Sequence, residues 1–247
     1  VVYGADTDFS PYDSGSYASS TAYVTGKAVE RACRELKEKM SAIASELLSV
    51  PASDLIFTSD GIGTADGKAR VSLGEIAAKS MNGNTSAVQV TVSHSSPTSP
   101  PPFMAGAAEV EVDLETGQVE LIKFAAAVDC GTPLNENLAR VQTEGGLVQG
   151  IGMALYEDVS YSKDGKVHEN SFMQYKVPSR LDVGRVQVEF ESSFEPTGPF
   201  GAKSIGEVVI NTPSPAIANA VYNAVGVRIR ELPITAEKVF KGMNGLD

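Results

Sequence analysis

The stretch from Gly198 to Glu207 brings three glycines and one carboxylate together within ten residues. Glycine lets bare backbone come close to a ligand, and loops of this kind often carry functional side chains. A carboxylate at the end of such a loop could accept a proton from a bound reactant. A glycine-rich turn between a strand and a helix, followed by a solvated glutamate, would have the same composition, so the pattern alone allows both interpretations.

A second candidate site is the small-residue loop near the start of the chain, Asp13-Ser14-Gly15-Ser16-Tyr17-Ala18-Ser19-Ser20. It precedes a predicted helix that contains Ala28 and Ala32. Amides and hydroxyls near a helix start can bind a phosphate or another anionic oxygen. The alternative is a cluster of residues that only caps the helix.

A third segment runs from Gln142 to Gly152 and has glycines at positions 145, 146, 150 and 152 inside a predicted helix. Each glycine costs up to about 1 kcal/mol relative to alanine in a helix interior. Such a sequence indicates close approach by another backbone or by a cofactor. Close packing of the helix on a sheet would explain the glycines equally well, and Gln142 would then be a surface amide.

Hydrophobic periodicity and turn residues predict the elements that must position these segments. The predicted helices cover residue 28 up to Pro51, residues 73–81, 138–155 and 213–224, and a last segment from Thr235. The predicted strands cover residues 55–58, 69–72, 88–92, 108–114, 119–124, 186–191 and 227–229, with hairpin turns at 115–117 and 164–165 and a stiff proline-rich loop at 97–102. This order predicts an α+β fold with mixed or antiparallel sheets in two lobes, about 1–105 with 205–247 and about 106–204.

Taken in order, the three segments resemble the C-terminal molybdopterin-binding half of the large subunit of molybdenum hydroxylases, the family of xanthine dehydrogenase and aldehyde oxidoreductase. The runs 215–220, 226–229 and 232–235 extend the similarity, so that it covers nearly the whole chain. The resemblance implies that Glu207 is the catalytic base, which takes a proton from a metal-bound hydroxide. It also implies cofactor-binding residues, which are Ser16, Tyr17, Ala18, Ser19, Ser20, Gln142, Lys203, Ser204, Ile205 and Gly206.

One departure from the family pattern lies in the first loop. The family's loop is often Gly-Gly-Ser-Arg, whereas Tyr17 and Ser20 stand here. Contacts made by the backbone would survive this change, but a contact made by an arginine side chain would not.

The resemblance further implies a molybdenum–molybdopterin cofactor, in the cytosine dinucleotide form, whose metal needs no protein side chain as a ligand. It implies iron–sulfur clusters and FAD on partner subunits or on segments outside this sequence, and an upstream molybdopterin-binding half as a partner. The expected reaction is oxidative hydroxylation of a small-molecule N-heterocycle such as xanthine, with water as the oxygen source. The alternatives are an aldehyde, carbon monoxide or aryl-CoA oxidoreductase of the same family, or a non-catalytic assembly fragment. The isolated chain is expected to be inactive.

Composition limits the other partners. The net charge of -11 disfavours nucleic acids and anionic membranes. The start lacks the layout of a signal peptide and no window is apolar enough to cross a bilayer, which predicts a cytoplasmic protein. The first residue is Val1 and not methionine, which indicates a truncated or processed piece.

The remaining reactive residue types show no metal-ligand spacing. We expect Cys33, on a helix, and Cys130, at a strand end, to be free core thiols. We expect His94 and His168 to be loop or hydrogen-bonding residues.

Overall fold

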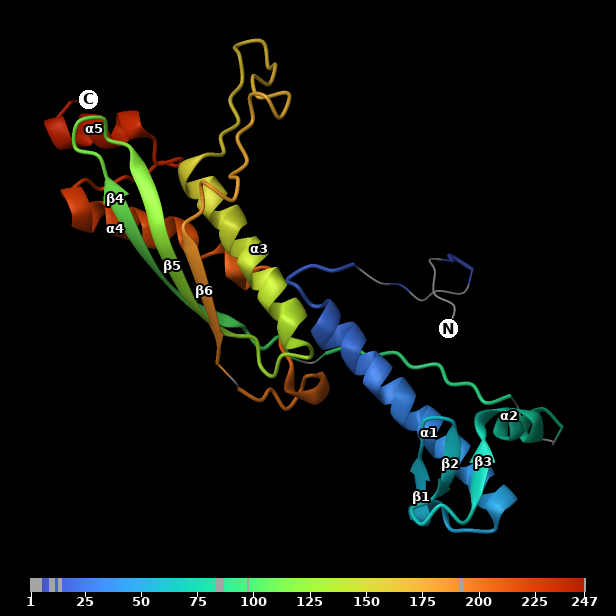
Figure 1. The fold of residues 1–247 in the computed structure, drawn as a ribbon. Coiled ribbons are helices and arrows are strands. Elements are labelled where there is room, and N and C mark those ends of the chain that lie inside the picture. Colours follow the sequence, from blue (N-terminus) through green and yellow to red (C-terminus); the bar gives the residue numbers. More distant parts are fainter. Residues whose placement is uncertain are drawn as a thin grey trace. The chain divides into compact units, whose positions relative to one another are not determined.

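The computed structural model describes residues 6–8, 12, 15–82, 87–96, 98–191 and 193–246 (Figure 1). Asp13 and Ser14 of the first loop lie outside these ranges, as does Pro97. The chain forms two compact units, one of Val1–Tyr23 with Thr98–Asp247 and one of Val24–Pro97. The predicted lobes, about 1–105 with 205–247 and about 106–204, have other bounds than these units.

The larger unit is built on a mixed three-stranded sheet. Strands β4 (Phe103–Val112) and β5 (Val119–Asp129) form the predicted long hairpin, and β6 (Arg185–Phe190) pairs in parallel with β5. The turn between β4 and β5 needs Gly117, whose φ is +77°. Side chains alternate across a strand, so one face of β5 is buried, with Phe124, Ala126 and Val128.

Three helices follow from clear sequence signals. Helix α3 (Glu136–Leu155) begins at Asn135, whose side chain accepts a hydrogen bond from Leu138 N. Helix α4 (Pro213–Val225) has proline in its first turn and ends at Gly226, and α5 (Ala236–Asn244) is capped by Thr235. All three helices were predicted.

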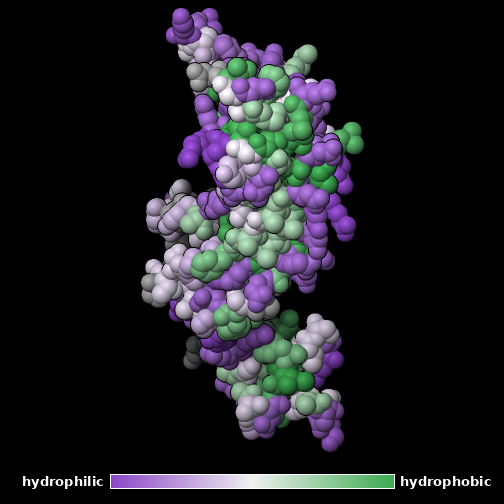
Figure 2. Space-filling view, turned by 90° about the vertical axis from the view of Figure 1, so that its left-hand side faces the viewer, coloured by the Kyte–Doolittle hydropathy of each residue, from purple (hydrophilic) through white to green (hydrophobic). Residues whose placement is uncertain are grey.

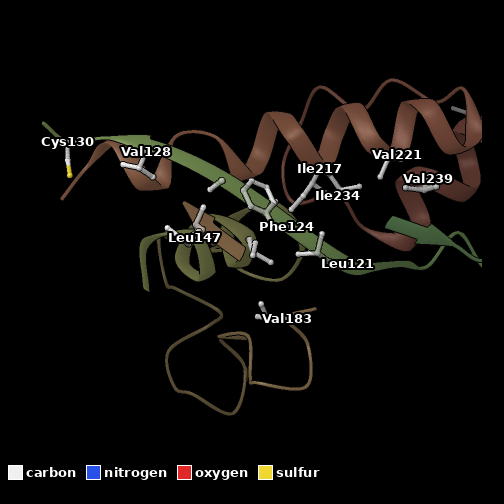
Figure 3. Packing of buried hydrophobic residues seen from close by; sticks show 14 residues of the cluster. Leu121, Phe124, Val128, Cys130, Leu147, Val183, Ile217, Val221, Ile234 and Val239 are labelled. Atoms are coloured by element: carbon white, nitrogen blue, oxygen red, sulfur yellow. The ribbon is translucent and has the colours of Figure 1, made fainter. Parts of the chain in front are cut away.

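These helices and the sheet share one hydrophobic core. Phe124 of β5 is fully buried in a cluster with Leu147 of α3 and Ile217 of α4 (Figure 3). Val239 of α5 joins the same cluster. Burying a large apolar side chain stabilises a fold by about 1.5–3 kcal/mol, so this core fixes the strand ends and helix starts that surround the site.

The smaller unit joins α1 (Gly26–Leu48) to an antiparallel sheet of β1 (Leu55–Phe57), β2 (Gly61–Thr64) and β3 (Arg70–Ser72), followed by α2 (Leu73–Asn82). Its core is Ala44, Ile62, Val71 and Ile76. A capping box begins α2, since Ser72 and Glu75 exchange hydrogen bonds. The predicted helix at 73–81 is thus confirmed, and Gly83 and Asn84, the glycine and asparagine that follow it in the sequence, lie outside the described residues.

Two predicted strands are wrong. The described residues 88–92 alternate in burial but pair with no strand, and the carbonyls of Gln89 and Ser93 accept hydrogen bonds from Lys39 and Arg31 of α1 instead. Residues 227–229 likewise form no strand. In the other direction, β2 is a strand that the sequence did not predict, because its two glycines hid a strand whose bare backbone lies close to β3.

A long segment without regular helices or strands, residues 156–184, connects α3 to β6 within the larger unit. Its predicted turn at residues 164–165 closes a short hairpin with a single bridge between Tyr161 and Val167. Phe172 is 87% exposed and Leu181 is 95% exposed. Elsewhere too, the surface drawn in Figure 2 carries hydrophobic patches among hydrophilic residues.

Candidate functional site

A cavity of about 480 Å³ in the larger unit brings the three sequence segments together. Its wall includes six of the predicted site residues, which are Ser16, Ser19, Gln142, Lys203, Ile205 and Gly206. Tyr17, Ala18, Ser20 and Ser204 are not part of the wall, although they are neighbours of residues that are. Tyr17 is 65% exposed.

The wall also contains residues that the sequence interpretation missed. They come from the end of β5, from the start of α3 and from the positions next to the predicted ones: Ala22, Cys130, Thr132, Pro133, Leu134, Asn135, Leu138, Ala139 and Ala202. The run from Cys130 to Asn135 joins a buried strand to a capped helix, and a strand-to-helix junction beside Gln142 is the signal that could have indicated them.

Glu207 lies at the rim of this cavity, directly after Gly206 of the wall. Its side chain is exposed, and its Oε2 accepts a hydrogen bond of 3.0 Å from Ser19 Oγ. Gln142 Nε2 donates to the carbonyl oxygen of Gly206 at 3.4 Å. The first loop, the glycine-rich helix and the Glu207 loop therefore meet at one place.

Gly206 leaves room for the Ser19 hydroxyl. A Cβ at this position would lie 2.7 Å from Ser19 Oγ, closer than real Cβ contacts. Any side chain at position 206 would thus push away the hydroxyl that binds Glu207.

The first loop has an unusual backbone. Ala18 and Ser19 have φ angles of +48° and +53°, in the left-handed region that residues other than glycine seldom adopt. Tyr17 N and Ser20 N donate hydrogen bonds to the loop's own carbonyls, those of Gly15 and Tyr17. Strained conformations of this kind cost about 1–3 kcal/mol and cluster at functional sites.

The glycines of α3 serve packing, at least in part. A Cβ on Gly146 would lie 2.2 Å from Cγ2 of Val209, which is fully buried in the short helix η4 (Val208–Ile210) that follows Glu207. A Cβ on Gly150 would lie 2.7 Å from Cγ of Pro213 of α4. Gly145 differs, because nothing lies within 4 Å of its Cβ position. Close packing on η4 and α4 therefore accounts for Gly146 and Gly150.

Lys203 lines the cavity, but its ammonium is engaged elsewhere. Nζ lies 2.7 Å from Asp129 Oδ2 and donates to the Pro101 carbonyl at 3.2 Å. Burial acts to raise the pKa of Asp129, but hydrogen bonds from Lys203, Ser193 and Gly131 outweigh it, so this pKa lies below its ordinary value.

The two cysteines differ. Cys130 is buried as predicted, and this burial raises the pKa of its thiol, which keeps it protonated. Cys33 is exposed on α1, so its prediction as a core thiol is wrong: the apolar stripe of α1 faces β2 and β3, and Cys33 lies off that stripe. His168 Nδ1 bonds Ser160 Oγ at 3.1 Å, in keeping with a hydrogen-bonding role.

Within the described ranges, no group of three or more His, Cys, Asp or Glu side chains is placed to hold a metal ion. Of the helices in the described part of the chain, none has the length and apolar character needed to cross a membrane.

The cavity nevertheless suits a group with phosphate and polar oxygens. Although the chain carries a net charge of -11, the described wall contains no acidic residue. It contains instead the hydroxyls of Ser16 and Ser19, the amide of Gln142 and the first turn of α3, whose helix dipole favours an anion. Because the Ser19 hydroxyl donates to Glu207, the donors that fit a pterin phosphate are the Ser16 hydroxyl, the second amide N–H of Gln142 and the start of α3.

Comparison with known proteins also indicates a pterin-binding protein, and the similarity covers nearly the full chain. Residues 1–184 match the family of molybdopterin cofactor-binding domains. A probable hypoxanthine oxidase of Escherichia coli (strain K12), XdhD, is 35% identical over 98% of this chain and 25% of that protein.

Two solved structures are similar in fold and sequence. Quinoline 2-oxidoreductase from Pseudomonas putida 86 has a TM-score of 0.81 and 25% identity, over 97% of this chain and 32% of that one. A Cu,Mo-CO dehydrogenase has a TM-score of 0.81 and 27% identity, over 97% and 31%. The chain thus spans about a quarter to a third of the length of these proteins.

Proposed function

This chain belongs to the molybdopterin cofactor-binding domains of the molybdenum hydroxylase family, and from that premise we propose that it forms one wall of a molybdenum–pterin site and supplies the proton acceptor, Glu207. The observation that carries the proposal is the meeting of Ser19, Gln142 and Gly206 beside Glu207, at the rim of a cavity without acidic residues.

The cofactor would be held mainly by small residues and backbone. Ser16 presents a hydroxyl to the cavity and Gln142 keeps a second amide N–H beside the one that binds Gly206, so each can donate to a phosphate or pterin oxygen, whereas the Ser19 hydroxyl donates to Glu207. Ile205 and Gly206 line the same cavity. The bound group, proposed to be molybdopterin cytosine dinucleotide, supplies two-electron redox chemistry at its molybdenum.

Glu207 would accept a proton as the reaction proceeds. Its carboxylate is oriented by Ser19 Oγ, and general-base catalysis needs such an acceptor within hydrogen-bond distance of the reacting group. Because η4 packs on Gly146 directly behind it, the backbone of Glu207 is fixed to α3, the helix that also carries Gln142.

The proposed substrate is an N-heterocycle such as xanthine, hydroxylated with oxygen from water. The names of a hypoxanthine oxidase and a quinoline 2-oxidoreductase among the relatives support this class. Carbon monoxide is the first alternative, since a CO dehydrogenase has the same fold. Aldehydes and aryl-CoA thioesters are further candidates.

The proposed partners are an upstream molybdopterin-binding half, an iron–sulfur subunit and an FAD subunit. Two observations support them: the chain spans a third or less of its relatives, and large apolar side chains such as Phe172 are exposed. Without these partners, we expect the chain to hold little molybdenum and to show no turnover.

The test is to purify the chain alone and co-expressed with the products of neighbouring genes, and to measure molybdenum and pterin per chain. Dye reduction is then assayed with xanthine, quinoline, an aldehyde and carbon monoxide. Molybdenum and turnover only in the assembled form support the proposal. An assembled form without molybdenum or pterin would favour a non-catalytic assembly role.

A further inference from the structure

We propose that Asp129 and Lys203 act as a positioning pair that fixes the Glu207 loop to the end of β5. This inference rests on the proposed function only in taking Glu207 as the proton acceptor. The family resemblance implied that Lys203 binds the cofactor, and here it has a positioning role instead.

The ammonium of Lys203 is placed for an internal contact. The side chain is 7% exposed, and its ammonium donates to two acceptors, Asp129 Oδ2 at 2.7 Å and the Pro101 carbonyl at 3.2 Å. Nζ also lies 5.2 Å from the centre of the Phe103 ring, within the range of a cation–π contact. These partners surround the charge and leave it poorly placed to reach a group in the cavity.

The carboxylate of Asp129 is used on both sides. While Oδ2 faces Lys203, Oδ1 accepts from Gly131 N at 2.9 Å and from Ser193 Oγ. Asp129 therefore joins three segments: the end of β5, the loop after β6 and the Glu207 loop.

A backbone contact completes this arrangement. Lys203 N donates to the Cys130 carbonyl at 2.8 Å, and Thr132 N donates to the Gly201 carbonyl at 2.8 Å. The two backbones approach so closely that a Cβ on Gly131 would lie 2.3 Å from the Gly201 oxygen. Because these contacts end at Lys203, the short link 204–206 is all that separates them from Glu207.

The consequence is that the ion pair controls where Glu207 stands relative to the cavity. Small displacements of a catalytic group can cost about a hundredfold in rate, even when the change is made outside the reacting centre. Losing the pair should thus lower turnover through the position of Glu207 while leaving the cofactor-binding wall at Ser16, Ser19 and Gln142 in place.

The experiment compares Asp129→Asn and the paired variant Asp129→Asn with Lys203→Met in the assembled enzyme. The single change leaves a buried ammonium without its counter-ion, and the paired change removes both charges, so the second variant stays informative where the first fails to fold. Lys241→Met is the matched control, because Lys241 forms an exposed ion pair with Glu237 on α5. Three quantities are measured: molybdenum per chain, kcat per molybdenum with KM, and amide hydrogen exchange of residues 201–208 against β5.

We expect the paired variant to keep its molybdenum, to lose about tenfold to a hundredfold in kcat per molybdenum with little change in KM, and to exchange faster at residues 201–208 but not in β5. Lys203→Arg alone retains the positive charge, so its kcat per molybdenum should lie between those of the paired variant and the wild type. Loss of molybdenum with normal kcat per molybdenum would overturn the proposal in favour of a cofactor ligand, and unchanged exchange at 201–208 would overturn it as well. Hydrogen exchange does not depend on Glu207 being the base, so a failure of the proposed function remains distinguishable.

Discussion

Ser19 Oγ donates a hydrogen bond of 3.0 Å to Glu207 Oε2 across 188 residues of sequence. The donor belongs to a strained loop and the acceptor follows a glycine that has no room for a side chain. The two motifs that the sequence suggested separately are therefore parts of one site. This relationship makes the role of each residue testable by itself.

The first prediction concerns Glu207→Gln in the assembled enzyme. Glutamine keeps the shape and can still bond Ser19, but it cannot accept a proton. General-base catalysis contributes about 10²–10⁴ in rate, so kcat per molybdenum should fall by that factor while molybdenum content stays normal. Steady-state kinetics normalised to bound metal measures the effect.

The control for this variant is Glu115→Gln, in the exposed turn between β4 and β5, which should leave the rate unchanged. A purely structural Glu207 would give a different result. Thermal stability and molybdenum content would then fall together, and the rate per molybdenum would stay near wild type.

The second prediction separates strain from hydrogen bonding at Ser19. Ser19→Ala and Ser19→Gly both remove the hydroxyl, so both should lower kcat per molybdenum by a similar factor, about threefold to tenfold, the value of one modest hydrogen bond. Only glycine relieves the positive φ of +53°. Ser19→Gly should therefore unfold at a higher temperature than Ser19→Ala, and equal melting temperatures would contradict this view of the loop.

Much of the fold could be predicted because its signals are local. The apolar stripe of α1, the cap at Asn135 and the prolines at the start of α4 each act within a few residues. The strand predicted at residues 88–92 failed because alternation describes burial and does not supply a neighbouring strand. Pairing is a long-range property that a single sequence does not show.

The candidate site was predictable only in part for the same reason. Glycines and the carboxylate at 198–207 marked the loop, and the family resemblance joined it to Ser19 and Gln142. No local signal indicated that Lys203 would bind Asp129, because the two residues lie 74 positions apart in the sequence. The sequence around Asp129 is that of an ordinary strand end.

The third prediction uses two adjacent glycines of α3 in the purified chain. Gly146→Ala should destabilise it by about 1–3 kcal/mol, because the new methyl would lie 2.2 Å from Cγ2 of Val209. Gly145→Ala should stabilise it by up to about 1 kcal/mol, since its Cβ position is open and alanine is the better helix former. Urea unfolding measures both, and the same sign for the two variants would contradict the packing of η4 on α3.

The last prediction concerns acid and Asp129→Asn. Removing one partner of a buried ion pair costs about 3–5 kcal/mol, and because the side chain of Asp129 is 20% exposed we expect a loss of about 2–3 kcal/mol of unfolding free energy at neutral pH.

The pH dependence follows from the pKa of Asp129, which folding lowers. The contribution of the Asp129 carboxylate to the unfolding free energy is therefore fully present above the ordinary value of 3.8 and is lost as the pH falls through the lowered value. The difference in unfolding free energy between the wild type and the variant should therefore stay constant from neutral pH to about pH 4 and shrink below it. Urea titrations at a series of pH values measure this difference, with Lys241→Met as the control that shows little change. A difference that grew with acid would mean that the Asp129 carboxylate is stabilised in its protonated form, and the ion pair with Lys203 would then not be what holds the loop at neutral pH.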